Sequence, residues 1–481
     1  MIIQLPHFRY LSFHFLIIGF IAMPFSSRSQ TPELSSLHEL KKLSVEELMN
    51  IEVTSVSKRP ERLIEAASAI QVITREDIQR SAATTVPEAL RLSSNLQVTQ
   101  LNSRHWIISS RGFNNIFANK LLVMIDGRTV YSPLFAGVFW DAQNVLLEDV
   151  DRIEIISGPG GTLWGTNAVN GVINIITRNS KNTQGIFVSG TYGSALKKQA
   201  EARYGGSIGS KLSYRVYGQY SDRNETALSN GNDDTDKWRQ GQGGFQIDWD
   251  PSDADVISLQ GNFYGGKEHD TPNLLSIDGQ NLMGKWSHTF SERSGIIIQA
   301  YADRTWRHDI TIDDELETYD IDFQHHYIAS KRHNLVWGMG YRFMNDESWN
   351  NTQYVGFLPA DRKMSLFSSF IQDEITVIPE RLKFTIGSKL QHTNFTGFEV
   401  QPSARIAWTP KKQHTLWSAV SRAVRAPSRI DVDYHIPAYI VPPDQPSVAG
   451  GPNFVSEKLI AYELGYRVHP THLFSLSLAT F

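Results

Sequence analysis

Side chains that could carry out chemistry are scattered along these 481 residues and form no recognisable catalytic set. Covalent catalysis needs a nucleophile with a base positioned beside it, and no Ser, His and Asp arrangement can be singled out. His325 and His326 are adjacent, and neighbouring residues of a strand point to opposite faces, so this pair cannot chelate one metal ion. The chain has no cysteine, which excludes disulfides and thiolate metal sites.

Two acidic runs, 232–236 and 313–315, offer the hard oxygen ligands that calcium prefers. Neither run has the spacing of an EF-hand, and charged runs in loops are usually solvated. We therefore expect no metal site, no cofactor and no enzymatic activity.

The most distinctive segment is 150–178, where a short apolar strand enters a glycine-dense turn and a β-branched run follows. Four glycines from Gly158 to Gly165 predict a tightly bent connector, because glycine permits positive φ and close backbone approach. A phosphate-binding loop is the alternative. The run lacks the Lys-Ser/Thr of a P-loop and the spacing of a dinucleotide fingerprint.

Two upstream motifs accompany this segment, Ser110-Arg111-Gly112-Phe113 and Met124-Ile125-Asp126-Gly127-Arg128. The three motifs, in this order, resemble the plug domain of TonB-dependent outer-membrane receptors. The resemblance covers nearly the whole chain after its leader. It implies an α+β plug domain inside a membrane-spanning antiparallel β-barrel, with about 22 strands in a full-length relative.

The first 30 residues predict a secretory signal peptide, with a weakly basic start, an apolar run from Leu11 to Phe25 and small residues after it. The apolar run is shorter than the about 20 residues that a membrane-spanning helix needs, so any later span must be made of strands. A net charge of −4 gives no basic field for nucleic acid.

Residues 31–56 are expected to lie in the periplasm, with a short helix over 43–49 capped by Ser44. The following residues alternate like a strand that has no partner in view. In the family, an exposed segment at this place is the TonB box, which pairs edge-on with a strand of TonB. A plain linker strand is the alternative. The candidate TonB-contacting residues are Ile51, Glu52, Val53, Thr54, Ser55 and Val56.

Residues 57–180 are predicted to form the plug domain. Helices are expected around 75–78 and 86–91, and strands around 107–109 and 121–125. About 120 residues are enough for a separate core.

Residues 181–481 are predicted to form the barrel, because a period of two residues replaces the helical one. Leu212, Tyr214, Val216 and Tyr220 share one face, and Ile460, Tyr462 and Leu464 share another opposite Glu463 and Arg467. Connections also alternate between short turns and long polar loops, as in outer-membrane barrels. A soluble sandwich could alternate similarly, so the leader and the plug resemblance decide between the two.

Segments of strand length from Ile186 onward number roughly fifteen. Single-chain bacterial barrels have even strand numbers, and an open edge in lipid leaves backbone groups unsatisfied. We therefore expect an incomplete barrel from a fragment or a prematurely terminated reading frame.

Three charged residues could hold the plug to the barrel wall, namely Arg111, Arg152 and the lumen-facing Glu463. A solvated surface role is the alternative for either arginine. Substrate contacts are expected on the plug apex, where aromatic side chains on loops give broad contact area, or else these residues pack the plug against the barrel. The candidates are Asn114, Asn115, Phe117, Tyr131, Phe135 and Trp140.

The resemblance implies a monomeric outer-membrane transporter for a scarce nutrient, a ferric siderophore or similar metal chelate, energised by TonB and its inner-membrane complex. Vitamin B12, haem or an oligosaccharide are alternative substrates, because the loops carry no readable code. A passive porin or adhesin, and an outer-membrane enzyme, are alternative classes. Outer-membrane lipid is the other expected partner.

A membrane barrel can be tested by gel electrophoresis. The unheated protein is expected to migrate faster than the boiled protein, because a hydrogen-bonded barrel wall resists detergent at room temperature. Equal migration of the two samples would contradict a barrel.

Overall fold

One antiparallel sheet of 15 strands occupies the second part of the chain, in the order of the sequence from β10 to β27. The fold is that of a computed structural model, which describes residues 49, 51–268, 275–308, 312–350, 355–436, 448–471 and 474–481. The signal peptide and nearly all of the expected helix 43–49 lie outside this range. Residues 1–42 and 43–481 are separate units, and the second is described below.

The expected number of strands is confirmed, and each is paired with its neighbours along the sequence. No ladder joins β10 to β27 among the described residues. The strands of this sheet, called the wall below, are β10 (Gly185–Tyr192), β11 (Leu196–Ile208), β12 (Leu212–Arg223), β13 (Trp238–Trp249), β14 (Asp255–Glu268), β15 (Ser276–Ser291), β16 (Ser294–His308), β17 (Asp313–Ile328), β18 (His333–Ser348), β20 (Asp361–Ile378), β21 (Leu382–Thr393), β22 (Gly397–Lys411), β23 (His414–Arg425), β26 (Glu457–Thr471) and β27 (Phe474–Thr480).

The two faces of the wall differ as the alternation predicts. On β12, Val216 is 48% exposed whereas Arg215 is 5% exposed, and on β26, Tyr462 is 72% exposed. Many exposed positions are apolar, and the buried ones include many Gln, Arg, Asp and Ser side chains beside some apolar ones. The outer face therefore suits lipid, and the inner face needs polar partners.

The plug domain is built on a mixed five-stranded sheet in the order β3-β8-β9-β6-β7. Its central strands are rich in Ile, Leu and Val and form a core with two short helices. The elements are β3 (Ile70–Thr74), β8 (Val150–Ser157), β9 (Gly171–Thr177), β6 (Leu121–Ile125), β7 (Arg128–Thr129), α2 (Arg75–Ser81) and α3 (Val86–Leu90).

Local sequence explains where these helices begin. The Thr74 hydroxyl accepts from the Asp77 N–H at 3.2 Å and Asp77 returns the contact to the Thr74 N–H, which is a capping box. Thr85 caps α3, and Pro87 occupies its first turn. Both helices and the strands expected at 107–109 and 121–125 are confirmed.

Shorter elements complete the described chain. Among the described residues, no helix combines the length and apolar composition needed to cross a membrane. The shorter elements are β1 (Glu52–Val53), β2 (Glu61–Arg62), η1 (Leu63–Glu65), β4 (Gln97–Gln100), β5 (Trp106–Ser109), η2 (Leu147–Asp149), α4 (Gly161–Trp164), η3 (Ser180–Asn182), β19 (Gly356–Phe357), α5 (Arg429–Val432), β24 (Tyr434–Ile436) and β25 (Val448–Ala449).

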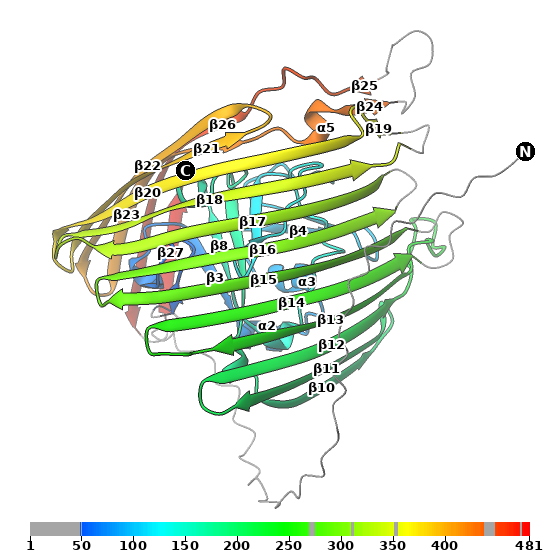
Figure 1. Cartoon of the computed structure of the whole chain (residues 1–481), viewed down its shortest axis with the longest axis horizontal. Coiled ribbons are helices and arrows are strands. Elements are labelled where there is room, and N and C mark those ends of the chain that lie inside the picture. Colours follow the sequence, from blue (N-terminus) through cyan, green and yellow to red (C-terminus); the bar gives the residue numbers. More distant parts are fainter. Residues whose placement is uncertain are drawn as a thin grey trace, which may run out of the picture. The chain divides into compact units, whose positions relative to one another are not determined.

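The plug lies against the polar inner face of the wall (Figure 1). Asp149 of the plug pairs with Arg203 on β11, near one end of the strand order. Arg467 on β26, near the other end, donates to plug carbonyl oxygens. Contacts at both ends of the strand order require the wall to curve around the plug.

Candidate functional site

One ion pair joins the plug motif Ser110-Arg111-Gly112-Phe113 to the wall. Arg111 Nη2 donates to Glu463 Oε1 at 2.7 Å, and the two side chains are 14% and 8% exposed. The same guanidinium donates to the Ser157 carbonyl oxygen at 3.1 Å. Gly158, with φ of +122°, lies so close to the Glu463 carboxylate that a Cβ there would overlap it. The structure thus brings together two of the three residues proposed to hold the plug.

The glycine-dense turn forms the docking surface of the plug on strands β21 to β23. Cβ atoms at Gly161 and Gly165 would collide with the side chains of Gln401 and Gln391. Gln391 Oε1 also accepts from the Thr166 N–H at 2.6 Å. The glycines are therefore needed because wall glutamines pack directly on the plug backbone.

Arg467 is a wall residue that the candidate set did not include. Its guanidinium donates to the carbonyl oxygens of Leu63, Ala66 at 3.1 Å and Ser68 at 2.9 Å, and the residue is 1% exposed. The alternation already placed it on the inner face beside Glu463. That placement was the available signal, but no spacing identifies the backbone oxygens as its partners.

Arg152 is not part of the plug–wall contact, so the prediction that it helps to hold the plug to the wall is wrong. Its side chain donates to Glu154 at 2.9 Å and to Asp151 at 2.6 Å, both within the plug. No ion pair joins it to the wall in the described part of the chain. Residues two apart on a strand share a face, so Glu154 captures the guanidinium locally.

The segment Ile51–Val56 also differs from its prediction, because its strand has a partner. β1 pairs with β2, and Val53, Ser55 and Val56 are buried. Glu154 accepts from the N–H groups of Thr54 and Ser55 at 3.0 and 2.8 Å. A buried carboxylate holds the segment because it needs several donors to offset its lost hydration.

Three of the proposed substrate contacts lie in one loop of the plug between β5 and β6. Asn115 is exposed and Phe117 is 43% exposed, while Asn114 is half-buried and bonded to Ser109 and Thr99. Phe113 and Ile116 in the same loop are 66% and 60% exposed. This loop, residues 112–119, is called the apex loop below and presents an apolar aromatic surface.

Phe135 does not belong to that surface. It is 6% exposed and lies in an apolar cluster with Leu134 and Phe357, the latter from an outer connection of the wall. The packing alternative therefore holds for Phe135, because its ring is covered by the connection that carries β19.

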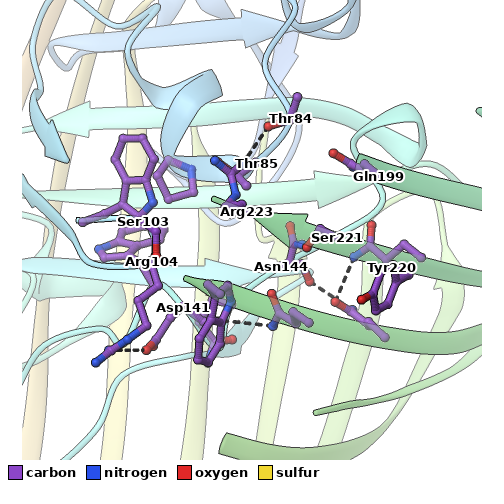
Figure 2. A pocket seen from close by; sticks show the side chains of 18 residues that line it. Thr84, Thr85, Ser103, Arg104, Asp141, Asn144, Gln199, Tyr220, Ser221 and Arg223 are labelled. Atoms are coloured by element: carbon purple, nitrogen blue, oxygen red, sulfur yellow. Dashed lines mark hydrogen bonds and ion pairs between the residues drawn. The ribbon is translucent and has the colours of Figure 1, made fainter. Parts of the chain in front are cut away.

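Trp140 is likewise only 9% exposed and lines a pocket between plug and wall (Figure 2). The pocket has a volume of about 30 Å³, which is room for about one water molecule. Figure 2 shows Arg104 beside Asp141, and Arg223 of the wall beside Thr84. Trp140 is thus part of the plug's own apolar core, at the edge of the pocket.

Asp141 is a buried carboxylate between the plug and the wall. Burial alone would raise its pKa, but Arg307 of the wall and Arg104 of the plug hold the pKa of Asp141 below its usual value. Arg307 donates to it at 2.6 Å and Arg104 at 3.2 Å. The carboxylate stays ionised and is shared between plug and wall.

Tyr131 is half-buried, and burial raises the pKa of its hydroxyl. It lines a larger polar cavity of about 590 Å³ between plug and wall. A cavity of this volume is within the range of small-molecule sites. On the wall side the cavity is lined by Gln, Ser, Asp and Lys side chains from β13 to β21.

Two outer connections of the wall meet above the plug. β19 pairs with β24 and β24 with β25, which joins residues 356–357 to 434–436 and 448–449. The N–H groups of Arg429 and Ile430 in α5 donate to the plug carbonyl oxygens of Pro133 and Leu134 at 3.0 and 2.8 Å. The Arg429 side chain is fully buried and bonds Asp346 and Asp433. This outer cover is fastened to the plug backbone.

In the described part of the chain, no group of three or more His, Asp or Glu side chains is placed to hold a metal ion. His325 and His326 contact different partners, Ser294 and Asn334. Asp236 accepts from the N–H groups of Ser103 and Thr226, which occupies the carboxylate with protein donors.

Comparison with known proteins agrees with this architecture. Residues 62–172 match the family of the TonB-dependent receptor plug domain, and residues 173–481 match the TonB-dependent receptor-like β-barrel. The chain therefore belongs to the TonB-dependent receptors. It is an outer-membrane protein, and the matched families comprise receptors and transporters rather than enzymes.

Individual relatives are more distant. The vitamin B12 transporter BtuB of Vibrio cholerae is 31% identical over 159 residues, 33% of this chain and 26% of that protein. The iron-regulated outer membrane virulence protein of Vibrio cholerae is 25% identical over 429 residues, 81% of this chain and 60% of that protein. The chain thus spans about a quarter and about three fifths of these relatives.

Solved structures show the same fold. The siderophore receptor PirA from Pseudomonas aeruginosa has a TM-score of 0.66 at 19% identity, over 85% of this chain and 74% of that one. PirA from Acinetobacter baumannii has a TM-score of 0.69 at 16% identity, over 87% and 70% of the two chains.

The variant Glu463→Gln is expected to weaken plug docking by about 3–5 kcal/mol, because it leaves the buried Arg111 cation without its counter-charge. The measurement is the urea concentration at which protease first cleaves the plug. Glu457→Gln is the matched control: Glu457 is on the same strand and pairs with plug Lys120, but its side chain is 49% exposed. That pair should contribute at most about 1 kcal/mol. Equal effects of the two variants would refute a special role for Glu463.

Plug stability is also expected to depend on pH through Glu61 on β2. Burial raises its pKa to about 7, opposed by Arg59 and assisted by Glu374. The folded state therefore holds a proton that the unfolded state, with a pKa of 4.5, releases. As the pH rises from 4.5 to about 7, the free energy of unfolding should fall by about 1.4 kcal/mol per pH unit.

Unfolding of the plug by urea from pH 4.5 to 8 tests this, with Glu61→Gln as the comparison. Glutamine cannot ionise, so the variant should lose this slope and gain stability above pH 7. An identical slope in both proteins would show that Glu61 is not the titrating group.

Proposed function

We propose that the chain acts as a TonB-dependent outer-membrane transporter that takes up a ferric siderophore or a similar metal chelate. The observation that carries the proposal is a folded plug fastened by buried polar contacts to the inner face of a lipid-facing wall. Such a plug blocks passive flow, so transport requires its displacement. The iron-regulated relative that matches 81% of this chain supports iron as the cargo.

In this proposal, TonB engages Ile51–Val56, driven by the inner-membrane proton gradient. Strand addition there needs free backbone donors, and the Thr54 and Ser55 N–H groups are bonded to Glu154. TonB therefore contacts this segment only as these bonds break. The polar cavity of about 590 Å³ beside the plug is the space that displacement widens.

Substrate first meets the apex loop. Phe113, Ile116 and Phe117 expose apolar area, and Asn115 supplies a polar group beside them. Aromatic surfaces suit a chelate whose metal is wrapped in an organic ligand, because rings give area at little entropy cost. Vitamin B12 is a second candidate, supported by the 31% identity with BtuB.

Uptake of iron-55 from a panel of ferric siderophores, compared with uptake of labelled cobalamin, tests the proposal in cells that express the chain. Accumulation of iron is expected, and a protonophore should abolish accumulation while surface binding persists. Uptake that continues with the protonophore would indicate a passive porin, and accumulation of cobalamin alone would favour the second candidate.

The double variant Phe113→Ala and Phe117→Ala should raise the Kd for the accepted chelate by at least about tenfold, as expected for exposed aromatic anchors. Leu101→Ala, a control at a 56%-exposed apolar residue outside the apex loop, should leave the Kd unchanged.

A further inference from the structure

The residues Thr54 and Ser55 are tied to three separate elements of the plug. Glu154 on β8 accepts from both N–H groups. Trp164 Nε1 in α4 donates to the Ser55 carbonyl oxygen at 2.8 Å. Asn174 Nδ2 on β9 donates to the Ser55 hydroxyl at 3.1 Å. This short piece of chain therefore cannot move without breaking or carrying bonds to β8, β9 and α4.

These bonds are strong ones. Glu154 is fully buried and Ser55 is 1% exposed, so water does not replace a lost partner. Hydrogen bonds to a carboxylate are stronger than neutral ones, and two of them end on Glu154. A load on the segment is therefore passed to its partners before the segment comes free.

The partner that matters is Trp164, because α4 and the residues directly after it dock on the wall. The Thr162 hydroxyl donates to the Gln401 carbonyl oxygen at 3.0 Å, and Thr166 N–H donates to Gln391 at 2.6 Å. The Asn167 N–H donates to the Val424 carbonyl oxygen at 2.8 Å. One indole N–H thus lies between the segment and three strands of the wall.

The order of contacts along the chain also supports transmission of a pull from the segment to α4. Lys58 and Arg59 follow the segment and pair with Asp322 and Glu374 of the wall. A pull from the N-terminal side reaches Thr54 and Ser55 before it reaches these ion pairs. The load on α4 therefore comes first.

We propose that Trp164 is a positioning residue that couples a pull on Ile51–Val56 to the release of α4 from β21, β22 and β23. Through the Ser55–Trp164 bond, displacement of the segment withdraws the glycine-dense turn from the wall glutamines. The coupling rests on the proposed function, since TonB supplies the pull.

Single-cysteine reporters can test this coupling, because the chain has no cysteine of its own. Val56→Cys reports on the segment and Thr166→Cys on the wall contact, and both positions are 6% exposed. Labelling by a small maleimide is measured in cells with and without a protonophore. In energised cells that receive the accepted chelate, both reporters should label.

The variant Trp164→Phe keeps an aromatic ring but lacks the N–H donor. In this background, energised labelling of Thr166→Cys should fall by about tenfold, the factor for one lost hydrogen bond, while Val56→Cys labels as before. Trp238→Phe, a buried tryptophan of β13, is the matched control and should change neither reporter.

Unchanged labelling of Thr166→Cys in the Trp164→Phe background would overturn the coupling and leave the proposed function standing. Increased labelling of Thr166→Cys in de-energised cells of the Trp164→Phe background would also overturn the coupling, since Trp164 would then act only in packing. Absence of energised labelling at Val56→Cys without the tryptophan change would overturn the proposed function as well. Glu154→Gln, which leaves the Ser55–Trp164 bond in place, should not reduce labelling of Thr166→Cys in energised cells.

Discussion

The alternation of side chains along the wall strands is the constraint on which the structure depends. Backbone groups facing lipid must be satisfied within the sheet, so the wall is a continuous antiparallel ladder. Its outer residues are apolar, and the intervening residues necessarily form an inner face of Gln, Arg, Asp and Ser. A plug on such a face shares only small apolar clusters with the wall. Directed polar contacts, each of which needs a partner opposite it, therefore hold much of the interface.

This explains the unusual character of the plug surface. Its own sheet has an ordinary apolar core, yet many of its contacts with the wall are made by backbone atoms and charges, beside a few small apolar clusters. Arg467 recognises three carbonyl oxygens of an irregular turn, and Gln391 and Gln401 pack against glycine backbone. Backbone contacts of this kind need close approach more than side-chain identity. That need accounts for the glycine-dense turn better than any ligand does.

Much of this could be predicted from the sequence because it follows from periodicity and local chemistry. The wall strands, the helices after Thr74 and Thr85, and the inward direction of Glu463 all follow from rules that act over a few residues. The differences concern which partner each side chain finds. Arg152 was assigned to the wall, although Glu154 on the same strand face captures it. Phe135 and Trp140 were candidates for substrate contact, with packing as the alternative, and the structure buries Phe135 under a wall connection and Trp140 in the plug core. Periodicity gives a side chain its direction, but it does not say what lies there.

The outer cover formed by α5 and the β19–β24–β25 sheet has a thermodynamic consequence. Its two backbone bonds end on Pro133 and Leu134, so the positions of the cover and the plug are not independent variables. Linkage is reciprocal: any ligand that favours one position of the cover favours the matching position of the plug by the same free energy. Ligand binding at the outer surface and release of the plug from the wall are then coupled, because both depend on the same equilibrium between positions of the plug.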